Sequence, residues 1–229
     1  MGNIMLRDGG VEFDATLLAA TEPSSVILFA VGSGGNPERH LPLLDSLVKR
    51  GSTVIAPHFE RLGSARPTAE ELSLRSRRLR LAVDFASQSN RPVIGVGHSI
   101  GATLLLALAG GQMWLGPNQR LPLALEDRLS RLVLMAPATV FFQAPKALDQ
   151  VHTPMLVWAG QNDVITSPAQ ADFLQRTLGN RVPFDLRVVA GAGHFSFMNT
   201  LPPQTHDPMP DREGFLAELA NEIGQWIST

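Results

Sequence analysis

The sequence predicts an α/β protein whose mostly parallel, twisted sheet is covered by helices on both faces. Two observations support this fold class. Short apolar runs rich in β-branched residues recur along the chain, as is typical of strands buried on both faces of a sheet. Most of these runs are separated by segments with helical patterning. This alternation favours parallel strands that are joined by helices.

The predicted elements follow one another along most of the chain. An antiparallel strand is expected first, at residues 11–18, from its apolar pattern. Buried strands are expected at residues 26–31, 53–56, 93–96, 132–135, 155–159 and 184–189. Helices are expected at residues 40–49, 69–87, 100–109, 169–177 and 212–227. Two stretches rich in Gly, Pro or Asn, 110–126 and 200–210, are predicted to be loops.

Length and composition favour a single domain over residues 1–229, because no internal repeat or long linker divides the chain. Apolar residues make up 44% of the sequence and charged residues 17%, so the chain can bury a substantial core. The net charge of −2 argues against a nucleic-acid partner. The densest basic run, residues 75–80, lies on a predicted helix and is expected to form a solvated face.

The chain contains no cysteine, which excludes disulfides and thiolate nucleophiles and fits a reducing compartment. The first residues lack an apolar segment of signal-peptide length, and no apolar stretch approaches the roughly 18 residues of a membrane span. We therefore expect a cytoplasmic protein, monomer or homodimer, with no membrane partner. The six histidines form no metal-ligand pattern, so no metal is expected.

One motif carries specific chemistry: G-x-S-x-G at residues 97–101, between an apolar strand and an apolar helix. This context is typical of a nucleophile elbow, a strained turn in which the hydroxyl of Ser99 is exposed and neighbouring side chains would collide. Two other interpretations use the same residues. Ser99 is also a good helix N-cap. Gly95 and its neighbours resemble a dinucleotide-binding turn, although no acidic residue ends a strand about 20 residues later.

A serine nucleophile needs a base that a third group orients. His194 lies in a Gly-rich turn after the last predicted strand, and Asp163 follows the strand before it. Asp163 is also an ordinary turn residue. However, the strand at residues 132–135 is followed by no carboxylate. Because the carboxyl ends of parallel strands meet at one edge of a sheet, Ser99, Asp163 and His194 are the predicted catalytic residues.

An oxyanion hole requires two N–H donors. The first is expected from Ile100, directly after the serine. The second is expected from the glycine-rich turn at residues 32–35, with Ser33 or Gly34 as donor. The alternative is that residues 32–35 form an ordinary glycine-rich turn without a catalytic role. A phosphate-binding loop is disfavoured because no G-K-[ST] sequence follows these residues.

Five residues are candidate substrate contacts because they flank these elements. Phe195 follows the candidate base, and Gly34 belongs to the candidate oxyanion turn. His98 precedes the serine, although local packing or hydrogen bonding is the more natural expectation for it. Trp114 and Phe141 lie in apolar segments of two loops, where they line either an acyl pocket or the core.

The residues at 32–35 and 97–101, with Gly160-x-x-Asp163 and Gly193-His194-Phe195, give the chain a clear resemblance to the α/β-hydrolase superfamily. The resemblance covers about residues 26–228. Within the superfamily, the chain looks most similar to small dienelactone-hydrolase-like esterases. It departs from them at its nucleophile, because dienelactone hydrolases use cysteine. It also has Val31 where many relatives have histidine.

The resemblance implies a sheet of about eight strands, and the short connection at residues 136–154 implies no large cap domain. It also implies hydrolysis of a small-molecule carboxylic ester through an acyl-enzyme, without a cofactor. Ser99 would attack, His194 would act as base and Asp163 would orient it, while Ile100 and Ser33 would stabilise the oxyanion. The alternatives are other acyl transfer on the same residues (thioesterase, amidase, peptidase or perhydrolase) and a binding protein without activity.

Overall fold

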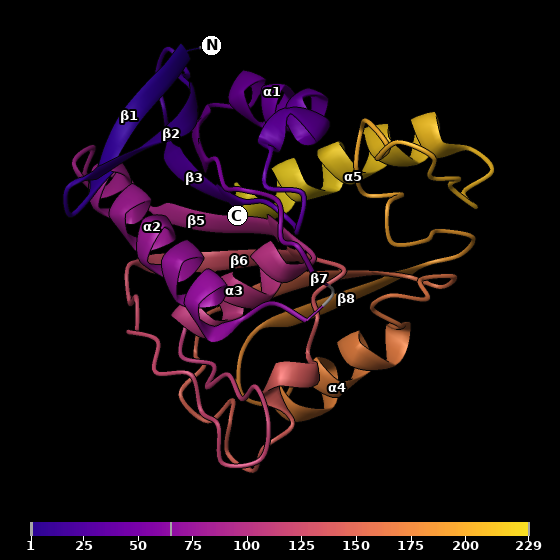
Figure 1. Cartoon of the computed structure of the whole chain (residues 1–229). Helices are drawn as coiled ribbons and strands as arrows, with labels where there is room; N and C mark the ends of the chain where they lie inside the picture. Colours follow the sequence, from indigo (N-terminus) through magenta and orange to yellow (C-terminus); the bar gives the residue numbers. More distant parts are fainter. Residues whose placement is uncertain (1, 65, 229) are drawn as a thin grey trace.

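A computed structural model describes residues 2–64 and 66–228 of the chain. In these residues, eight strands form one sheet in the order β1-β2-β4-β3-β5-β6-β7-β8 (Figure 1). Strands β3 to β8 run parallel to their neighbours among themselves, while β2 pairs antiparallel with β1 and with β4. The prediction of a mostly parallel sheet is therefore confirmed. The strands are β1 Gly2–Asp8, β2 Val11–Leu18, β3 Ser25–Ala30, β4 Ser52–Pro57, β5 Val93–His98, β6 Leu129–Met135, β7 Met155–Gly160 and β8 Phe184–Val189.

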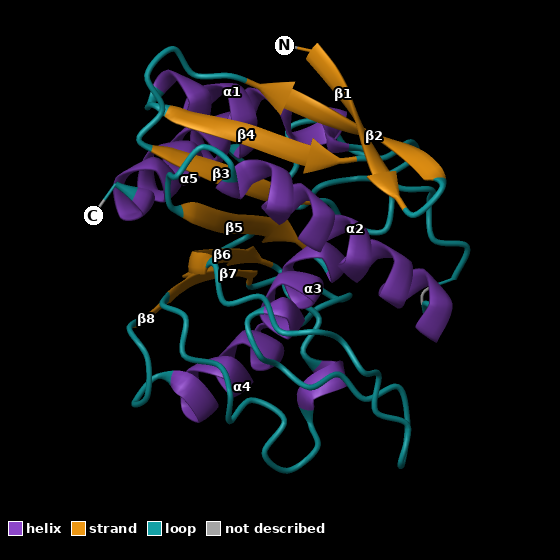
Figure 2. Cartoon of the chain, turned by 90° about the vertical axis from the view of Figure 1, so that its left-hand side faces the viewer, coloured by secondary structure: helices purple, strands orange, loops and turns teal. Residues whose placement is uncertain are grey.

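Helices cover both faces of the sheet. Helices α2 (Ala69–Ser87), α3 (Ile100–Leu108) and α4 (Pro168–Leu178) lie on one face, and α1 (Leu41–Lys49) and α5 (Arg212–Ile227) lie on the other (Figures 1 and 2). Two short 3₁₀ helices, η1 (Pro37–His40) and η2 (Val140–Phe142), complete the described set. Because residues 136–154 between β6 and β7 contain only η2, the molecule has no large cap there.

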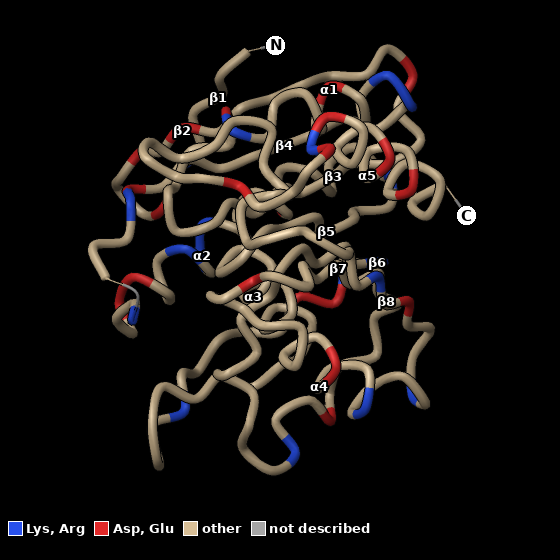
Figure 3. The backbone as a smooth tube through the Cα atoms, turned by 90° about the vertical axis from the view of Figure 1, so that its right-hand side faces the viewer, with Lys and Arg blue, Asp and Glu red and all other residues tan. Residues whose placement is uncertain are grey.

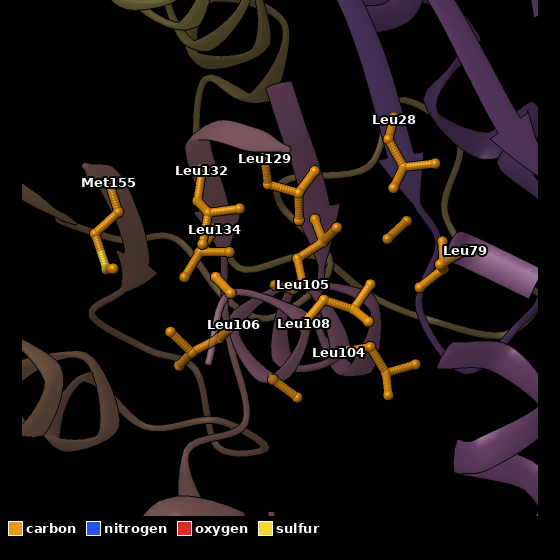
Figure 4. Close-up of a cluster of buried hydrophobic side chains, with 14 of the residues drawn as sticks. Leu28, Leu79, Leu104, Leu105, Leu106, Leu108, Leu129, Leu132, Leu134 and Met155 are labelled. Atoms are coloured by element: carbon orange, nitrogen blue, oxygen red, sulfur yellow. The ribbon is translucent and has the colours of Figure 1, made fainter. Parts of the chain in front are cut away.

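Each central strand contributes to two hydrophobic cores. In β3, Val26 and Leu28 pack into the core under α2 and α3, whereas Ile27 and Phe29 pack into the core under α1 and α5. Successive side chains of a strand point to opposite faces, so a strand covered on both sides is apolar at every position. Figure 4 shows the first core, in which leucines of α3 meet those of β6.

Both edges of the sheet differ from the expectation. Strand β1 was not predicted, because its side chains are exposed or half-buried and carry no clear apolar pattern. It is joined to β2 by Gly9 and Gly10, and the φ of +63° at Gly9 suits a two-residue hairpin turn. Strand β8 was predicted to be buried on both faces, and this is wrong. It is the last strand of the sheet, and its side chains alternate between half-buried and exposed along most of its length.

Acidic and basic residues are interspersed along the chain (Figure 3). In the part of the chain that the structure describes, no helix combines the length and the apolar character needed to cross a membrane. The same residues contain no group of three His, Asp or Glu side chains that could hold a metal ion.

Candidate active site

Ser99 occupies the sharp turn between β5 and α3. Its φ of +55° and ψ of −127° lie in a region that residues other than glycine rarely adopt. Its side chain makes no hydrogen bond that caps α3. Instead, Ser99 Oγ lies 3.0 Å from Nε2 of His194. The local geometry is thus that of an elbow that presents the hydroxyl, and the helix-cap interpretation does not describe it.

The glycines of the motif allow close contacts that a side chain would prevent. A Cβ atom on Gly101 would lie 2.1 Å from the carbonyl oxygen of Ala30, at the end of β3. A Cβ atom on Gly97 would lie 2.8 Å from the backbone nitrogen of Ala102. Both obstacles are backbone atoms, which cannot rotate away. The G-x-S-x-G spacing therefore lets the elbow pack directly against the neighbouring strand and helix.

The structure brings Ser99, Asp163 and His194 together, although 95 residues separate the first from the last. His194 Nδ1 lies 2.8 Å from Asp163 Oδ2, and its Nε2 faces Ser99 Oγ. The three residues directly follow or closely follow the carboxyl ends of β5, β7 and β8, at one edge of the sheet. Asp163 is 3% exposed and His194 is 7% exposed, so little water competes for their hydrogen bond.

The surroundings of Asp163 keep it ionised. Burial alone would raise its pKa, but the hydrogen bond and charge of His194 and the donors of Thr166 together hold the pKa below its usual value. Asp163 Oδ1 accepts hydrogen bonds of 2.8 Å from the N–H groups of Ile165 and Thr166. A carboxylate at this position makes Nδ1 the protonated nitrogen of a neutral His194, which leaves Nε2 free to accept a proton.

Thr166 is a member of the site that the sequence did not single out. Its Oγ1 lies 2.8 Å from Asp163 Oδ2 and 3.1 Å from the carbonyl oxygen of Ala136, which follows β6. Thr166 therefore links the acid to a third strand end. A hydroxyl residue three positions after an aspartate is common in ordinary turns, so the sequence contains no signal that distinguishes it.

Two further histidines lie in a row behind His194. His98 is 2% exposed, and its Nε2–H donates to the carbonyl oxygen of His194 at 2.9 Å. His98 is thus enclosed beneath the turn that carries His194 and does not face an open pocket. His40 follows, with its ring centroid 5.4 Å from that of His98. Burial lowers the pKa of His40 to about 3, and burial also lowers that of His98, with smaller effects from the neighbouring imidazoles. Both rings are therefore neutral.

The turn that carries His194 is also held from its other side. Ser196 Oγ accepts from the N–H of Gly193 at 2.8 Å and donates to Asp207 Oδ1 at 2.5 Å. Asp207 Oδ2 accepts from Arg212 Nε at 2.9 Å, at the start of α5. The predicted loop at residues 200–210 thereby packs against the histidine turn and restrains it.

The candidate oxyanion turn, at residues 32–35, lies beside Ser99. A Cβ atom on Gly32 would lie 3.5 Å from Cβ of Ser99. The turn is closed by a hydrogen bond of 3.2 Å from the N–H of Gly35 to the carbonyl oxygen of Gly32. Within the described chain, no protein acceptor takes the N–H of Ser33 or of Gly34. Both predicted donors are thus available, and Ile100 begins α3 directly after the serine.

Arg75 contradicts the expectation that residues 75–80 form a solvated face. Arg77 in the same run is exposed and pairs with Asp8, as expected of a surface residue. Arg75, in contrast, is 2% exposed, and its guanidinium reaches the turn at residues 32–35. A signal was present in the sequence, because Leu72 and Leu79 occupy the same helix face three residues before and four residues after it.

The remaining candidate contacts lie in two places. Phe195 is half-buried, and its ring meets that of His194 edge to face, with centroids 5.2 Å apart. Trp114 and Phe141 line an open pocket of about 820 Å³, together with Pro67 of the loop after β4. The side chains of Ser99, Asp163 and His194 are not part of its lining. Gly34 is exposed in the candidate oxyanion turn.

Comparisons with known proteins agree with this architecture. A family model described as the alpha/beta hydrolase family matches residues 27–148, while no curated protein matches the sequence. An alpha-beta serine hydrolase homologue from Coxiella burnetii has a TM-score of 0.70 at 17% identity, over 98% of this chain and 96% of that chain. Dienelactone hydrolase from Anabaena variabilis has a TM-score of 0.69 at 19% identity, over 99% of this chain and 96% of that chain.

A propionate-bound structure of an esterase from Thermogutta terrifontis has a TM-score of 0.69 at 17% identity, over 99% of this chain and 94% of that chain. At these identities, the likeness to the solved structures concerns the fold. The family model, in contrast, matches more than half of the 229 residues and includes the serine elbow. This chain belongs to the alpha/beta hydrolase family.

Proposed function

We propose that this protein hydrolyses carboxylic esters through an acyl-enzyme formed on Ser99. One observation carries the proposal. A continuous chain of hydrogen bonds joins Asp163 Oδ2 to His194 at 2.8 Å and His194 to Ser99 Oγ at 3.0 Å. This is the arrangement in which a base activates a serine and an acid orients the base.

In the first half of the reaction, Ser99 Oγ attacks the carbonyl carbon of the ester while His194 Nε2 takes its proton. The carbonyl oxygen becomes an oxyanion and accepts hydrogen bonds from the N–H groups of Ile100 and of Ser33 or Gly34. The carboxylate of Asp163 stabilises the imidazolium that forms. His194 then gives the proton to the leaving alkoxide as the ester C–O bond breaks, which leaves the acyl group on Ser99.

In the second half, a water molecule takes the place of the alcohol. His194 removes a proton from the water as its oxygen attacks the acyl carbon, and the same N–H groups hold the new oxyanion. Collapse of this intermediate breaks the bond to Ser99 Oγ, which regains its proton from His194. The products are a carboxylic acid and the free enzyme, so side chains and water suffice for the cycle.

A fluorophosphonate probe tests the proposal directly, because it reacts only with an activated serine. The folded wild type is expected to gain the mass of one phosphonyl group, and Ser99→Ala is expected to gain none, as measured by intact-protein mass spectrometry. Ser130→Ala, at an exposed position of β6, is the control and should label like the wild type. Absence of labelling in the folded wild type, or labelling of Ser99→Ala, contradicts the proposal. The choice of an organophosphorus probe is supported by the Thermogutta terrifontis esterase 2, for which a structure phosphorylated by paraoxon is known.

We also propose that the substrate carries a small or medium acyl group. The short connection after β6 leaves no large cap to cover a long chain. Each methylene adds about 0.8 kcal/mol only where the protein can bury it. With p-nitrophenyl esters, kcat/KM should be greatest for acyl chains of about two to eight carbons and fall for longer ones. A thioester and an anilide of the preferred acyl group complete the series. Cleavage of long-chain esters alone contradicts the proposed substrate class, and preference for the thioester or anilide contradicts ester hydrolysis.

A further inference from the structure

Arg75 is a buried cation that makes no salt bridge. It is 2% exposed, and no carboxylate in the described part of the chain lies within ion-pair distance of its guanidinium. The charge of Glu71, one turn earlier on α2, acts on it from farther away and raises its pKa less than burial lowers it. Burial lowers its pKa to about 10, so the side chain keeps its charge at neutral pH. A buried charge without an opposite charge is costly unless hydrogen bonds compensate for it. The hydrogen bonds of the guanidinium therefore show which groups stabilise its charge.

All three acceptors of the guanidinium are backbone carbonyl groups in two loops. Arg75 Nη1 donates to the carbonyl oxygen of Gly32 at 2.9 Å. Its Nη2 donates to the carbonyl oxygens of Glu60 at 2.6 Å and of Ser33 at 3.3 Å. The guanidinium carbon also lies 4.9 Å from the ring centroid of Phe59. Arg75 thus ties the turn after β3 to the loop after β4.

The direction of these carbonyl groups determines the direction of two N–H groups. In a trans peptide, the C=O of one residue and the N–H of the next point in opposite directions. The carbonyl of Gly32 shares its peptide plane with the N–H of Ser33, and the carbonyl of Ser33 shares its plane with the N–H of Gly34. The guanidinium holds the carbonyl of Gly32 and shares that of Ser33 with the N–H of Leu62, which donates to it at 2.9 Å. Both N–H groups therefore point away from the guanidinium. A cation at the carbonyl oxygen also polarises the peptide, which makes the N–H a stronger donor.

We propose that Arg75 is a positioning residue that orients and polarises the N–H donors of the oxyanion hole from behind the turn. The inference rests on the proposed ester hydrolysis, because it concerns the oxyanion of that reaction. Gly32 lies against Ser99, so a small rotation of its peptide displaces the donors relative to the nucleophile. Arginine suits the role because its planar fork holds several carbonyls in fixed directions, which the point charge of lysine does not.

Arg75→Met removes the charge and the fork while keeping much of the volume. We expect kcat for a p-nitrophenyl ester to fall by about 10- to 1,000-fold, up to the effect of removing one oxyanion donor, with KM changed by less than about threefold. The kcat of Arg75→Lys should lie between that of the wild type and that of Arg75→Met. Arg78→Met is the matched control, because Arg78 is on the same helix but contacts Phe13 of β2, at 4.8 Å, and Asp8 of β1 instead of the turn at residues 32–35. It should retain wild-type kcat.

Binding of a trifluoromethyl ketone separates positioning from a merely structural role. This compound forms a tetrahedral adduct with an oxyanion, so its inhibition constant should rise in Arg75→Met by about the factor by which kcat/KM falls. Folding of each variant is checked by circular dichroism and urea denaturation. If Arg75→Met does not fold, Arg75→Lys carries the same comparison. A folded Arg75 variant with wild-type kcat and wild-type inhibitor affinity overturns the inference.

Amide hydrogen exchange distinguishes failure of this inference from failure of the proposed function. The N–H groups of Gly35 and Leu62, which donate to the carbonyl oxygens of Gly32 and Ser33, should exchange faster in Arg75→Met than in Arg78→Met. If the wild type neither labels nor hydrolyses esters, the proposed function is contradicted, and faster exchange at Gly35 and Leu62 still supports Arg75 as the residue that holds the turn. Equal exchange in the two variants overturns that role.

Discussion

Replacing Ser99 by Ala or Asp163 by Asn is expected to lower kcat for an ester by roughly 10⁴- to 10⁶-fold, with little change in KM. Ser99→Ala removes the atom that forms the acyl-enzyme. Asp163→Asn replaces an acceptor by an amide, and the carboxylate that fixes the proton on Nδ1 of His194 is lost. The imidazolium that forms when His194 takes the proton of Ser99 then has no counter-charge.

The effects of Ser99→Ala and Asp163→Asn on kcat should not be additive. Because the candidate catalytic residues act as one unit, Ser99→Ala combined with Asp163→Asn should be no slower than Ser99→Ala alone, within about threefold. Steady-state kinetics with a p-nitrophenyl ester measures all three variants. Asp45→Asn, at an exposed position of α1, is the control for the loss of one negative charge. An Asp163→Asn enzyme within about tenfold of the wild type would exclude Asp163 as the orienting acid.

Replacing Gly101 by Ala is expected to lower the free energy of unfolding by more than about 4 kcal/mol, a loss large enough to unfold many domains. The added Cβ would lie 2.1 Å from the carbonyl oxygen of Ala30 and 2.5 Å from that of Val31. Relief requires α3 to move away from β3. Every residue of α3 is buried, so that movement opens the core on this face of the sheet.

Urea denaturation and the yield of folded protein measure this effect. Gly63→Ala is the matched control, because a Cβ atom on Gly63 has no heavy atom within 4 Å, and it should unfold like the wild type. A Gly101→Ala protein with wild-type stability would show that the elbow can move without cost. The same contact sets the distance between Ser99 and the turn at residues 32–35, so any folded Gly101→Ala protein should also be slower in ester hydrolysis.

Much of the fold was predictable because its determinants are local or periodic. A strand covered on both faces is apolar at every position, and a helix between two such strands implies a parallel crossover. Strands β3 to β7 follow this rule over most of their length, with polar residues confined to their ends, and the prediction located each of them within three residues of its observed start. Edge strands do not satisfy it. Half of their surface meets water, so β1 was not recognised and β8 was predicted to be more buried than it is.

The sequence by itself determined which residues could meet at the carboxyl edge. Parallel strands end at the same side of a sheet, so Ser99, Asp163 and His194 share an edge once their strands are recognised. The tertiary structure alone decided what surrounds them. Thr166 binds Asp163, His98 binds the carbonyl group of His194, and Arg75 binds two carbonyl groups of the turn at residues 32–35. These contacts join segments that are far apart in the sequence. Their distance and orientation in space depend on the packing of the whole sheet, which local sequence patterns do not specify.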